Sequence, residues 1–432
     1  MKPGCCSEWL ARFQFVTYRS LREGVLGAVT ATLGGTGFAR GFSALSFVGV
    51  ASLVSPDVLG RFSLSLAAVG VIAAVCLLGI PSIANQRIAA EIRPARAARI
   101  GSRAIVALLV WSALVAASGL LVLGLGDLSW SGGHPALLVF WSVGSACNVL
   151  LAALLQGNQA YRGASLLSAV RALAVGGVTL SIAVSRPTSV PLELGAACSE
   201  VAVAIAAAVI AGRRGYLTRN LGAIGLRSSL QLVRSVGLSG MGGILILVGV
   251  WLLQYLLSQG PSGFADNASF AISQRIALFG MIIPSAIAIV ATPAVASRLA
   301  HDRRLGILRY LPLLAFVPAC VYALVVGVNA EIILQMIAAP YGQAVWTLRI
   351  AVLLGVFIAL NNVLGGLALG LSMYRTWIAS DWILGLSMVV LGITLIGTWP
   401  TGPTGAAIAW GASYVLSVIF LAPMVLARLR SA

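Results

Sequence analysis

Long apolar runs alternate with short polar segments along the whole chain. Each run is about 20 residues or longer, the length that a helix needs to cross a hydrocarbon core of roughly 30 Å. Ten-residue segments of alternating polarity, which are typical of an outer-membrane barrel, are absent. The pattern predicts an all-α polytopic membrane protein with twelve spans, at residues 27–54, 62–84, 104–126, 136–158, 164–185, 190–211, 237–258, 268–292, 308–328, 345–370, 376–397 and 404–426.

Charge is scarce and unevenly placed. Charged residues make up 9% of the chain, against about 25% in soluble domains. If the N-terminus is cytoplasmic, 22 of the 28 Lys and Arg residues fall in inner segments, and two, Arg61 and Arg186, fall in outer loops. This asymmetry follows the positive-inside rule. It predicts a multi-pass membrane protein with both termini in the cytoplasm, and it explains the net charge of +17 without a nucleic-acid partner.

The second half of the chain repeats the first. A shift of 213 residues aligns 139–162 with 352–375, with 9 identities that include the pairs Asn148/Asn361 and Arg162/Arg375. Shifts of 211 and 210 align two further segments. Because each half holds six spans, the halves have the same orientation, the parallel-repeat plan of many transporters. We therefore predict an interfacial segment at 1–23, six-helix lobes at 24–212 and 237–432, a cytoplasmic connecting loop at 213–236, and a substrate cavity between the lobes.

Several segments resemble one family. "VSPDVLGRFSLSLA" (54–67), "FAISQRIALFGMIIPSAIAIVATPAVASRLAHD" (270–302) and "GPTGAAIAWGASYVL" (402–416) are similar to polysaccharide flippases of the multidrug/oligosaccharidyl-lipid/polysaccharide (MOP) superfamily. The resemblance implies a MATE-like fold, alternating access and a location in the bacterial cytoplasmic (inner) membrane. It also implies a non-enzymatic role in surface polysaccharide (O-antigen, lipopolysaccharide) biosynthesis: moving a polyprenyl-diphosphate-linked oligosaccharide to the outer leaflet. A polymerase and glycosyltransferases are the implied protein partners.

The lipid II flippases of that superfamily offer a second comparison. They carry a "GFVRD"-like string in the first span, and "GFARG" matches it at Arg40 but has Gly41 in place of the acid. Arg275 is in a position that resembles a cavity arginine of their eighth span. The missing acid, and twelve spans instead of fourteen, argue against lipid II as the substrate.

Arg40 is the most informative residue within a span. A charge at this depth is costly and usually faces the bundle interior or water. Thr36, Arg40 and Ser43 continue a helical stripe that begins at Thr32, whereas Gly34, Gly37 and Gly41 mark a neighbouring face for close helix packing. We expect Arg40 to face a central cavity and bind a diphosphate; the alternative is a buried charge bonded to backbone carbonyls.

Other polar residues within spans have two interpretations each. Arg275 is a candidate for the same cavity. Arg171 and Arg349 either contact substrate or extend to the membrane surface. Asn148 and Asn361 contact sugar or bond between helices. The acids Glu200 and Asp381 either carry a coupling proton or neutralise an arginine in a neighbouring span, and pairing is favoured.

Two other functions compete with the flippase. A multidrug antiporter of the same superfamily would need acids in its cavity to bind cationic drugs, and this chain has more cations than acids there. A glycan polymerase or ligase would need a substantial polar outer loop, whereas the longest outer connection, roughly 329–344, is mostly apolar. No CxxC spacing or His–Cys cluster indicates a metal, and no cofactor is expected. The expected partners are an anionic lipid-linked oligosaccharide and the bilayer.

Overall fold

The structure, a computed structural model, describes residues 34–89, 91, 93–125, 135–158, 160–218, 239–288, 310–337, 339–398 and 402–431. The predicted segment 1–23 and most of the loop 213–236 lie outside the described residues. Within the described part the regular secondary structure is helical throughout, which confirms the predicted class.

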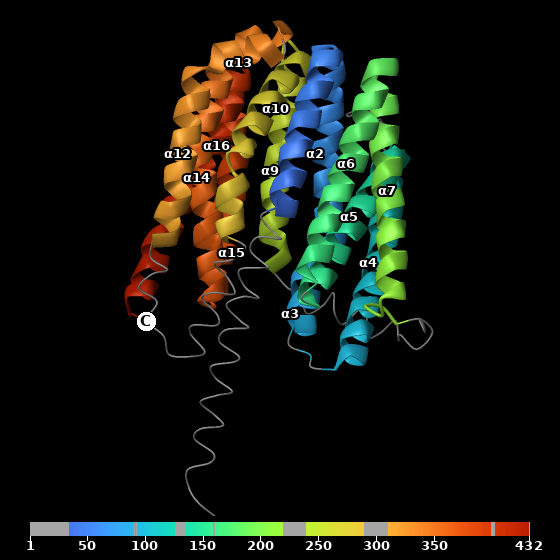
Figure 1. Ribbon diagram of the computed structural model, residues 1–432. Helices are drawn as coiled ribbons and strands as arrows, with labels where there is room; N and C mark the ends of the chain where they lie inside the picture. Colours follow the sequence, from blue (N-terminus) through green and yellow to red (C-terminus); the bar gives the residue numbers. More distant parts are fainter. Residues whose placement is uncertain are drawn as a thin grey trace, which may run out of the picture.

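The first half of the bundle contains a helix at residues 34–53 and six labelled helices (Figure 1). They are α2 (Pro56–Leu77), α3 (Ile80–Ala89), α4 (Pro94–Leu125), α5 (Pro135–Gly157), α6 (Tyr161–Ser185) and α7 (Ser189–Arg213). The second half contains α9 (Ser239–Ser258), α10 (Phe264–Phe279), a short helix Ile282–Ala288, α12 (Leu311–Val328), α13 (Ala330–Ile337), the 3-10 helix η3 (Ala339–Ala344), α14 (Val345–Gly370), α15 (Tyr374–Thr398) and α16 (Gly402–Ser431).

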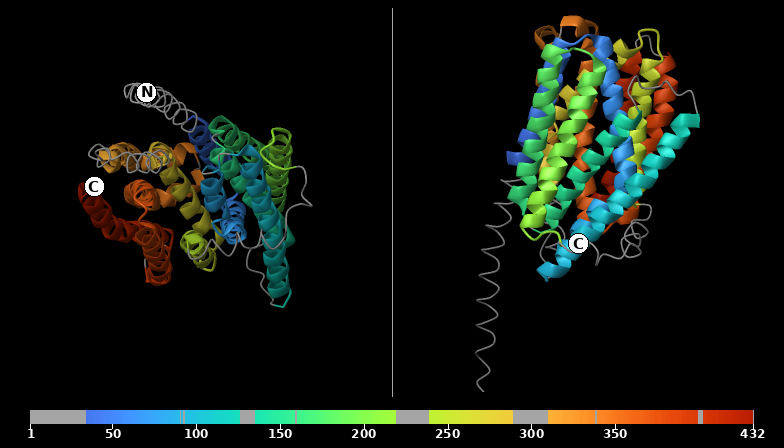
Figure 2. Two further views of the ribbon diagram at one scale, coloured as in Figure 1. Left: turned by 90° about the horizontal axis from the view of Figure 1, so that it is seen from below. Right: turned by 90° about the vertical axis from the view of Figure 1, so that its right-hand side faces the viewer.

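These helices make a multi-pass membrane protein. Ten of the described helices are long and apolar enough to cross a membrane, and α10 with Ile282–Ala288 forms an eleventh, bent candidate. The helix at 34–53 overlaps the first predicted span, so each of the twelve predicted spans overlaps an observed helix. The two short elements α13 and η3 lie across one end of the bundle, which we call the α13 end; the C-terminus lies at the other end (Figures 1 and 2).

Two predicted spans are not continuous helices. The span predicted at 62–84 is interrupted after Leu77, because Leu78 and Gly79 both have positive φ (42° and 76°) and turn the chain before α3 begins. The span predicted at 268–292 bends by 58° between α10 and the helix Ile282–Ala288. Pro284 accounts for this bend, because it cannot donate the backbone hydrogen bond that would continue the helix to Gly280.

The two halves use the same internal tie. Asn148 on α5 donates from Nδ2 to the carbonyl oxygen of Glu200 on α7, at 2.9 Å. In the second half, the Ser417 hydroxyl on α16 donates to Oδ1 of Asn361 on α14, at 2.8 Å. The repeat-related asparagines therefore both join the fourth predicted span of their half to the sixth. The two-lobed architecture is confirmed, and Figure 2 shows the lobes side by side.

The lobes meet where α2 of the first packs against α9 and α10 of the second. Gly60 makes this approach possible, because a Cβ at this position would overlap the carbonyl oxygen of Phe264. Asn267 Nδ2 donates to the Gly60 carbonyl at 2.7 Å, and Ser63 Oγ donates to Gln254 Oε1 at 2.9 Å. All these residues belong to the first three turns of α2 or to the nearby ends of α9 and α10, so the lobes are joined at the α13 end.

Candidate functional site

A cavity of about 680 Å³ lies between the lobes, on the side of their junction that faces away from the α13 end. Side chains from both halves line it, and its walls are partly aromatic, with Phe47, Phe62, Trp141 and Phe279. The polar and charged lining residues are Thr36, Arg40, Ser43, Ser46, Ser168, Arg171, Thr179, Glu200, Arg275, Ser285, Asn362 and Tyr414.

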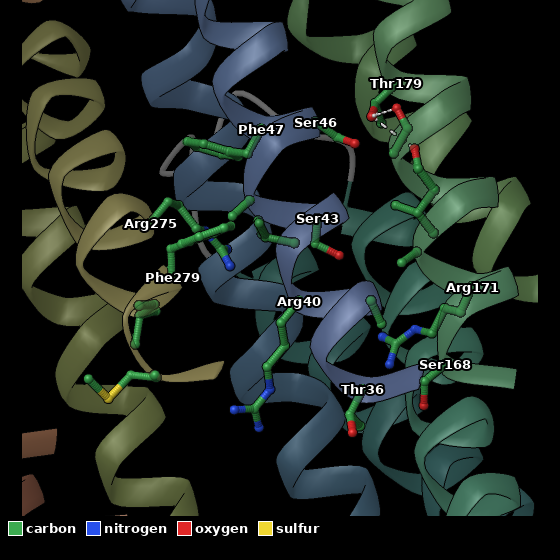
Figure 3. A pocket seen from close by; sticks show the side chains of 18 of the residues that line it. Thr36, Arg40, Ser43, Ser46, Phe47, Ser168, Arg171, Thr179, Arg275 and Phe279 are labelled. Carbon is green, nitrogen blue, oxygen red and sulfur yellow. Dashed lines mark hydrogen bonds between the residues drawn. The ribbon is translucent and has the colours of Figure 1, made fainter. Parts of the chain in front are cut away.

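The helix at 34–53 presents one face to the cavity. Thr36, Arg40 and Ser43, the described members of the polar stripe, all line it (Figure 3). Close packing fixes the helix on its other sides. Gly176 of α6 has room for no side chain, because a Cβ there would overlap the hydroxyl of Ser46. The helix is thereby held against α6, and the stripe is oriented away from lipid.

The predicted glycine face is also found, in part. A Cβ at Gly37 would come within 3.2 Å of Ile282, and one at Gly41 within 3.6 Å of Phe279. The helix at 34–53 therefore packs closely against the bent segment of the second lobe. Gly34, in contrast, has no atom of the described residues within 4 Å of its Cβ position. The contact with Phe279 gives Gly41 a packing role.

Arg40 is exposed to the cavity and has no ion-pair or hydrogen-bond partner within the part of the chain that the structure describes. The backbone-carbonyl alternative is therefore not what the described residues show. An arginine without a counterion in this setting is costly, and the cost is recovered when an anion binds. Its planar fork of N–H groups fits phosphate oxygens in pairs.

Arg275 reaches the same cavity from the second lobe. Its guanidinium carbon lies 5.3 Å from the centre of the Phe47 ring, a cation–π distance, so an aromatic face of the first lobe orients it. No carboxylate pairs with it among the described residues. Figure 3 shows Arg40, Arg275 and Arg171 approaching the cavity from three different helices.

Arg171 differs from these two because it has a counterion. Its Nε donates to both carboxylate oxygens of Glu200, at 2.8 and 2.9 Å, and its Nη2 donates to Oε1 at 2.7 Å. Nη2 also donates to Ser145 Oγ at 2.8 Å. Asn148 Nδ2 donates to Glu200 Oε2 at 2.7 Å. The structure thus pairs Glu200 with an arginine of a neighbouring span, the outcome favoured from the sequence.

Four predicted site residues lie outside the cavity lining. Arg349 donates from Nε to the Gly327 carbonyl at 3.2 Å, and its guanidinium lies over the Trp346 ring, so its contacts are with neighbouring helix residues and it does not line this cavity. Asn148 and Asn361 are buried in the interhelical bonds described above, the second of the two interpretations given for them, and neither lines this cavity.

Asp381, the other coupling candidate, is buried between α15 and α9. A Cβ at Gly242 of α9 would come within 2.7 Å of the Asp381 Cβ, so the glycine makes room for the acid. No ion pair to Asp381 is found among the described residues, and it does not line the cavity.

Two features of this region were not predicted. Glu193, a third acid within the predicted spans, is fully buried on α7; Ser65 Oγ donates to its Oε1 at 2.6 Å, and its Oε2 has no hydrogen-bond partner among the described residues. Asn362 lines the cavity, whereas its neighbour Asn361 does not. Adjacent residues on a helix point about 100° apart. The sequence "NN" therefore placed an asparagine near the cavity without indicating which of the two faces it.

The charged lining residues are three arginines and one acid, and the acid is bound to one of the arginines. Two positive charges, one from each lobe, are left without a counterion among the described residues. The surrounding hydroxyls, the Asn362 amide and the aromatic walls are neutral. Such a site is suited to an anion that also carries hydrogen-bonding and apolar groups.

By sequence, neither a protein-family model nor a curated protein matches the chain. By structure, it is similar to a multidrug resistance MATE family transporter of the MOP superfamily in an outward-facing conformation, with a TM-score of 0.67 and 15% identity over 94% of this chain and 96% of that one. It is also similar to such a transporter in an inward-facing conformation, with a TM-score of 0.68 and 14% identity over 94% of this chain and 99% of that one. The similarity to the lipid II flippase MurJ in an inward closed conformation has a TM-score of 0.70 and 13% identity over 91% of this chain and 88% of that one. At these identities the likeness concerns the fold alone, and the chain has the two-lobed helical fold of these membrane transport proteins.

Proposed function

We propose that this protein is an alternating-access flippase that moves a polyprenyl-diphosphate-linked oligosaccharide from the inner to the outer leaflet, for surface polysaccharide biosynthesis. The observation that carries the proposal is the charge of the cavity. Arg40 and Arg275 face it from different lobes without carboxylate partners among the described residues. A diphosphate supplies the missing negative charge.

Because the two arginines belong to different lobes, a bound diphosphate can influence how the lobes are arranged. Arg40 belongs to the first lobe and Arg275 to the second, so an anion bound by both links the lobes. Binding energy that depends on both lobes favours one relative arrangement of them over another, which is the requirement for a ligand to shift a conformational equilibrium.

The rest of the cavity matches a saccharide attached to that diphosphate. Ser43 and Asn362 offer hydrogen bonds, while Phe279 and Tyr414 offer flat apolar faces. A volume of about 680 Å³ is within the roughly 300–1,000 Å³ of small-molecule sites. This volume accommodates a diphosphate and a short oligosaccharide, which agrees with transport before polymerisation outside.

The direction of transport follows from the predicted topology. If the arginine-rich segments face the cytoplasm, the α13 end is the outer end. The bonds from Asn267 to Gly60 and from Ser63 to Gln254 then join the lobes on the outer side of the cavity. With this topology, the structure represents the conformation of the transport cycle in which the cavity is closed to the outside. These bonds break when the substrate is released to the outer leaflet.

A multidrug antiporter is the competing function, because its members share the fold. A cationic drug would meet two arginines without counterions, and the one acid that lines the cavity is occupied by Arg171. Like charges in a site of low dielectric repel strongly. The charge of the cavity therefore favours an anionic substrate.

Arg40 provides the test. In cells that lack the protein, we expect a lipid-linked oligosaccharide to accumulate in the inner leaflet and a surface glycan to be lost. Arg40→Ala should fail to restore the glycan although the protein inserts at normal levels. Arg40→Lys, which keeps the charge but loses the bidentate fork, should restore it in part. Arg349→Ala is the matched control, because this arginine also lies within a span but outside the cavity, and it should restore the glycan fully.

Protein level and glycan export are measured together. Full export by a normally expressed Arg40→Ala protein would contradict the proposal. Normal glycan display in the deletion strain, accompanied by sensitivity to cationic drugs, would favour the antiporter.

A further inference from the structure

One of the three cavity arginines, Arg171, is paired with an acid, Glu200. Glu200 is buried, and its carboxylate receives three hydrogen bonds from Arg171 and one from Asn148. Arg171 itself is about one-third exposed toward the cavity. Its Nη1 has no hydrogen-bond partner in the described chain. Arg171 is therefore positioned to meet a substrate phosphate, but its charge is neutralised where it stands.

We propose that Glu200 is the proton-binding residue of the transport cycle, and that its protonation releases Arg171 to become the third cation that binds the substrate diphosphate. This inference rests on the proposed function and names the coupling within it. The proton comes from solvent through the cavity, forms an O–H bond on the Glu200 carboxylate, and returns to solvent when the diphosphate leaves and Arg171 binds Glu200 again.

The surroundings of Glu200 make it the group that switches. Its helix, α7, packs against α5, α6 and α2. From α5 it faces the neutral Asn148 and Ser145, and from α6 it faces Arg171. The charged residues of α2 lie in its first two turns, near the α13 end. On α7 itself, Glu193 lies about two turns away and bonds to Ser65. Arg171 is thus the single charged group bonded to Glu200 among the described residues.

Linkage gives the sign of the effect. If the diphosphate binds the state in which Glu200 is protonated, binding takes up a proton, and affinity rises as the pH falls. One proton taken up per bound ligand corresponds to a tenfold lower dissociation constant for each unit by which the pH falls. Without such coupling, Arg171 and Glu200 would remain paired when the ligand binds. The dissociation constant would then change with pH only because the ligand itself gains or loses protons.

Asn148 is a positioning residue in this account. Its Nδ2 hydrogen bond to Oε2 stabilises the ionised carboxylate, since a donor favours the charged form. Asn148→Leu should therefore let Glu200 accept its proton more readily. The pH profile of substrate binding should move to higher pH in this variant, a change that a loss of packing alone would not produce.

The test uses the full-length protein in detergent with farnesyl diphosphate as the probe. Calorimetric titrations in buffers of different ionisation heat give the number of protons taken up, and titrations at pH 5.5, 6.5, 7.5 and 8.5 give the affinity. The probe itself titrates in this range, so the result is the difference between the wild type and Glu200→Gln. We expect about one additional proton in the wild type, and at pH 8.5 at least tenfold tighter binding by Glu200→Gln, in which Arg171 is already released.

A second variant keeps the test valid if Glu200→Gln does not fold. Arg171→Gln/Glu200→Gln removes both charges together, so neither is left buried alone. It should bind more weakly than the wild type at pH 5.5 and take up one proton fewer. Equal proton uptake and equal pH slopes in the wild type and the variants would overturn the inference while Arg40-dependent binding upheld the proposed function. Absence of Arg40-dependent binding at any pH would instead contradict the proposed function.

Discussion

Asn267 Nδ2 donates a 2.7 Å hydrogen bond to the carbonyl oxygen of Gly60, and this bond joins α10 of the second lobe to α2 of the first. Both residues are far apart in the sequence and lie at the α13 end of the cavity. The lobes can come this close because residue 60 has no side chain. The pair therefore marks the contact that must separate if the protein opens at that end.

Gly60→Ala should weaken this closure. The added Cβ would overlap the carbonyl oxygen of Phe264, a backbone atom that cannot rotate away, so the lobes must move apart. In a variant without native cysteines, a cysteine at Ser43 should then react severalfold faster with a membrane-impermeant thiol reagent added from the α13 side. Gly70→Ala, on the same helix but with no atom closer than 4.0 Å, should leave the rate unchanged. Equal rates in the two variants would argue against a closing contact at Gly60.

The Ser63–Gln254 bond should contribute to the same closure. Both side chains are buried, and the Ser63 hydroxyl donates to Gln254 Oε1 at 2.9 Å. A double-mutant cycle with Ser63→Ala and Gln254→Leu should give a coupling free energy of about 1 kcal/mol, the usual net value of a buried neutral hydrogen bond. Thermal unfolding in detergent measures it. Strict additivity would show that the two side chains do not interact in the folded protein.

Asn361 should matter for stability and not for substrate affinity. Its Oδ1 accepts from Ser417 Oγ, which lies 2.6 Å from Ser380 Oγ, so the amide completes a buried polar cluster away from the cavity. Asn361→Ala should lower the free energy of unfolding by about 1–3 kcal/mol, because it leaves the buried Ser417 hydroxyl only a longer contact of 3.4 Å to the Ser380 carbonyl oxygen. Farnesyl diphosphate affinity should change less than twofold. For comparison, Asn362→Ala should weaken binding of a diphosphate-linked sugar and leave stability nearly unchanged. The reverse pattern would exchange the roles of the two asparagines.

The positions of the helices could be predicted because each span is a long apolar run, and the membrane demands helices within such runs. The break at Leu78–Gly79 was missed because it interrupts the backbone without interrupting the apolar run. The bend near Pro284 had a visible signal, but proline within a span does not by itself fix the angle.

The site was predictable to a smaller extent. The stripe of Thr36, Arg40 and Ser43 could be read from helical spacing on one helix. The Arg171–Glu200 pair could be expected only as a class of contact, because spacing within one helix does not say which helix lies beside it. Arg349 could not be distinguished from a cavity arginine until its neighbours, Gly327 and Trp346, were known.

The central claim is that the cavity transports an anionic lipid diphosphate, and reconstitution tests it most directly. Proteoliposomes that contain the purified protein receive a fluorescent polyprenyl-diphosphate disaccharide, and a membrane-impermeant quencher reports its movement between leaflets. We expect translocation by the wild type and by Arg349→Ala, at least tenfold slower translocation by Arg40→Ala, and no uptake of a fluorescent organic cation. Translocation of the cation by the wild type, with the lipid diphosphate left in its original leaflet, would contradict the account.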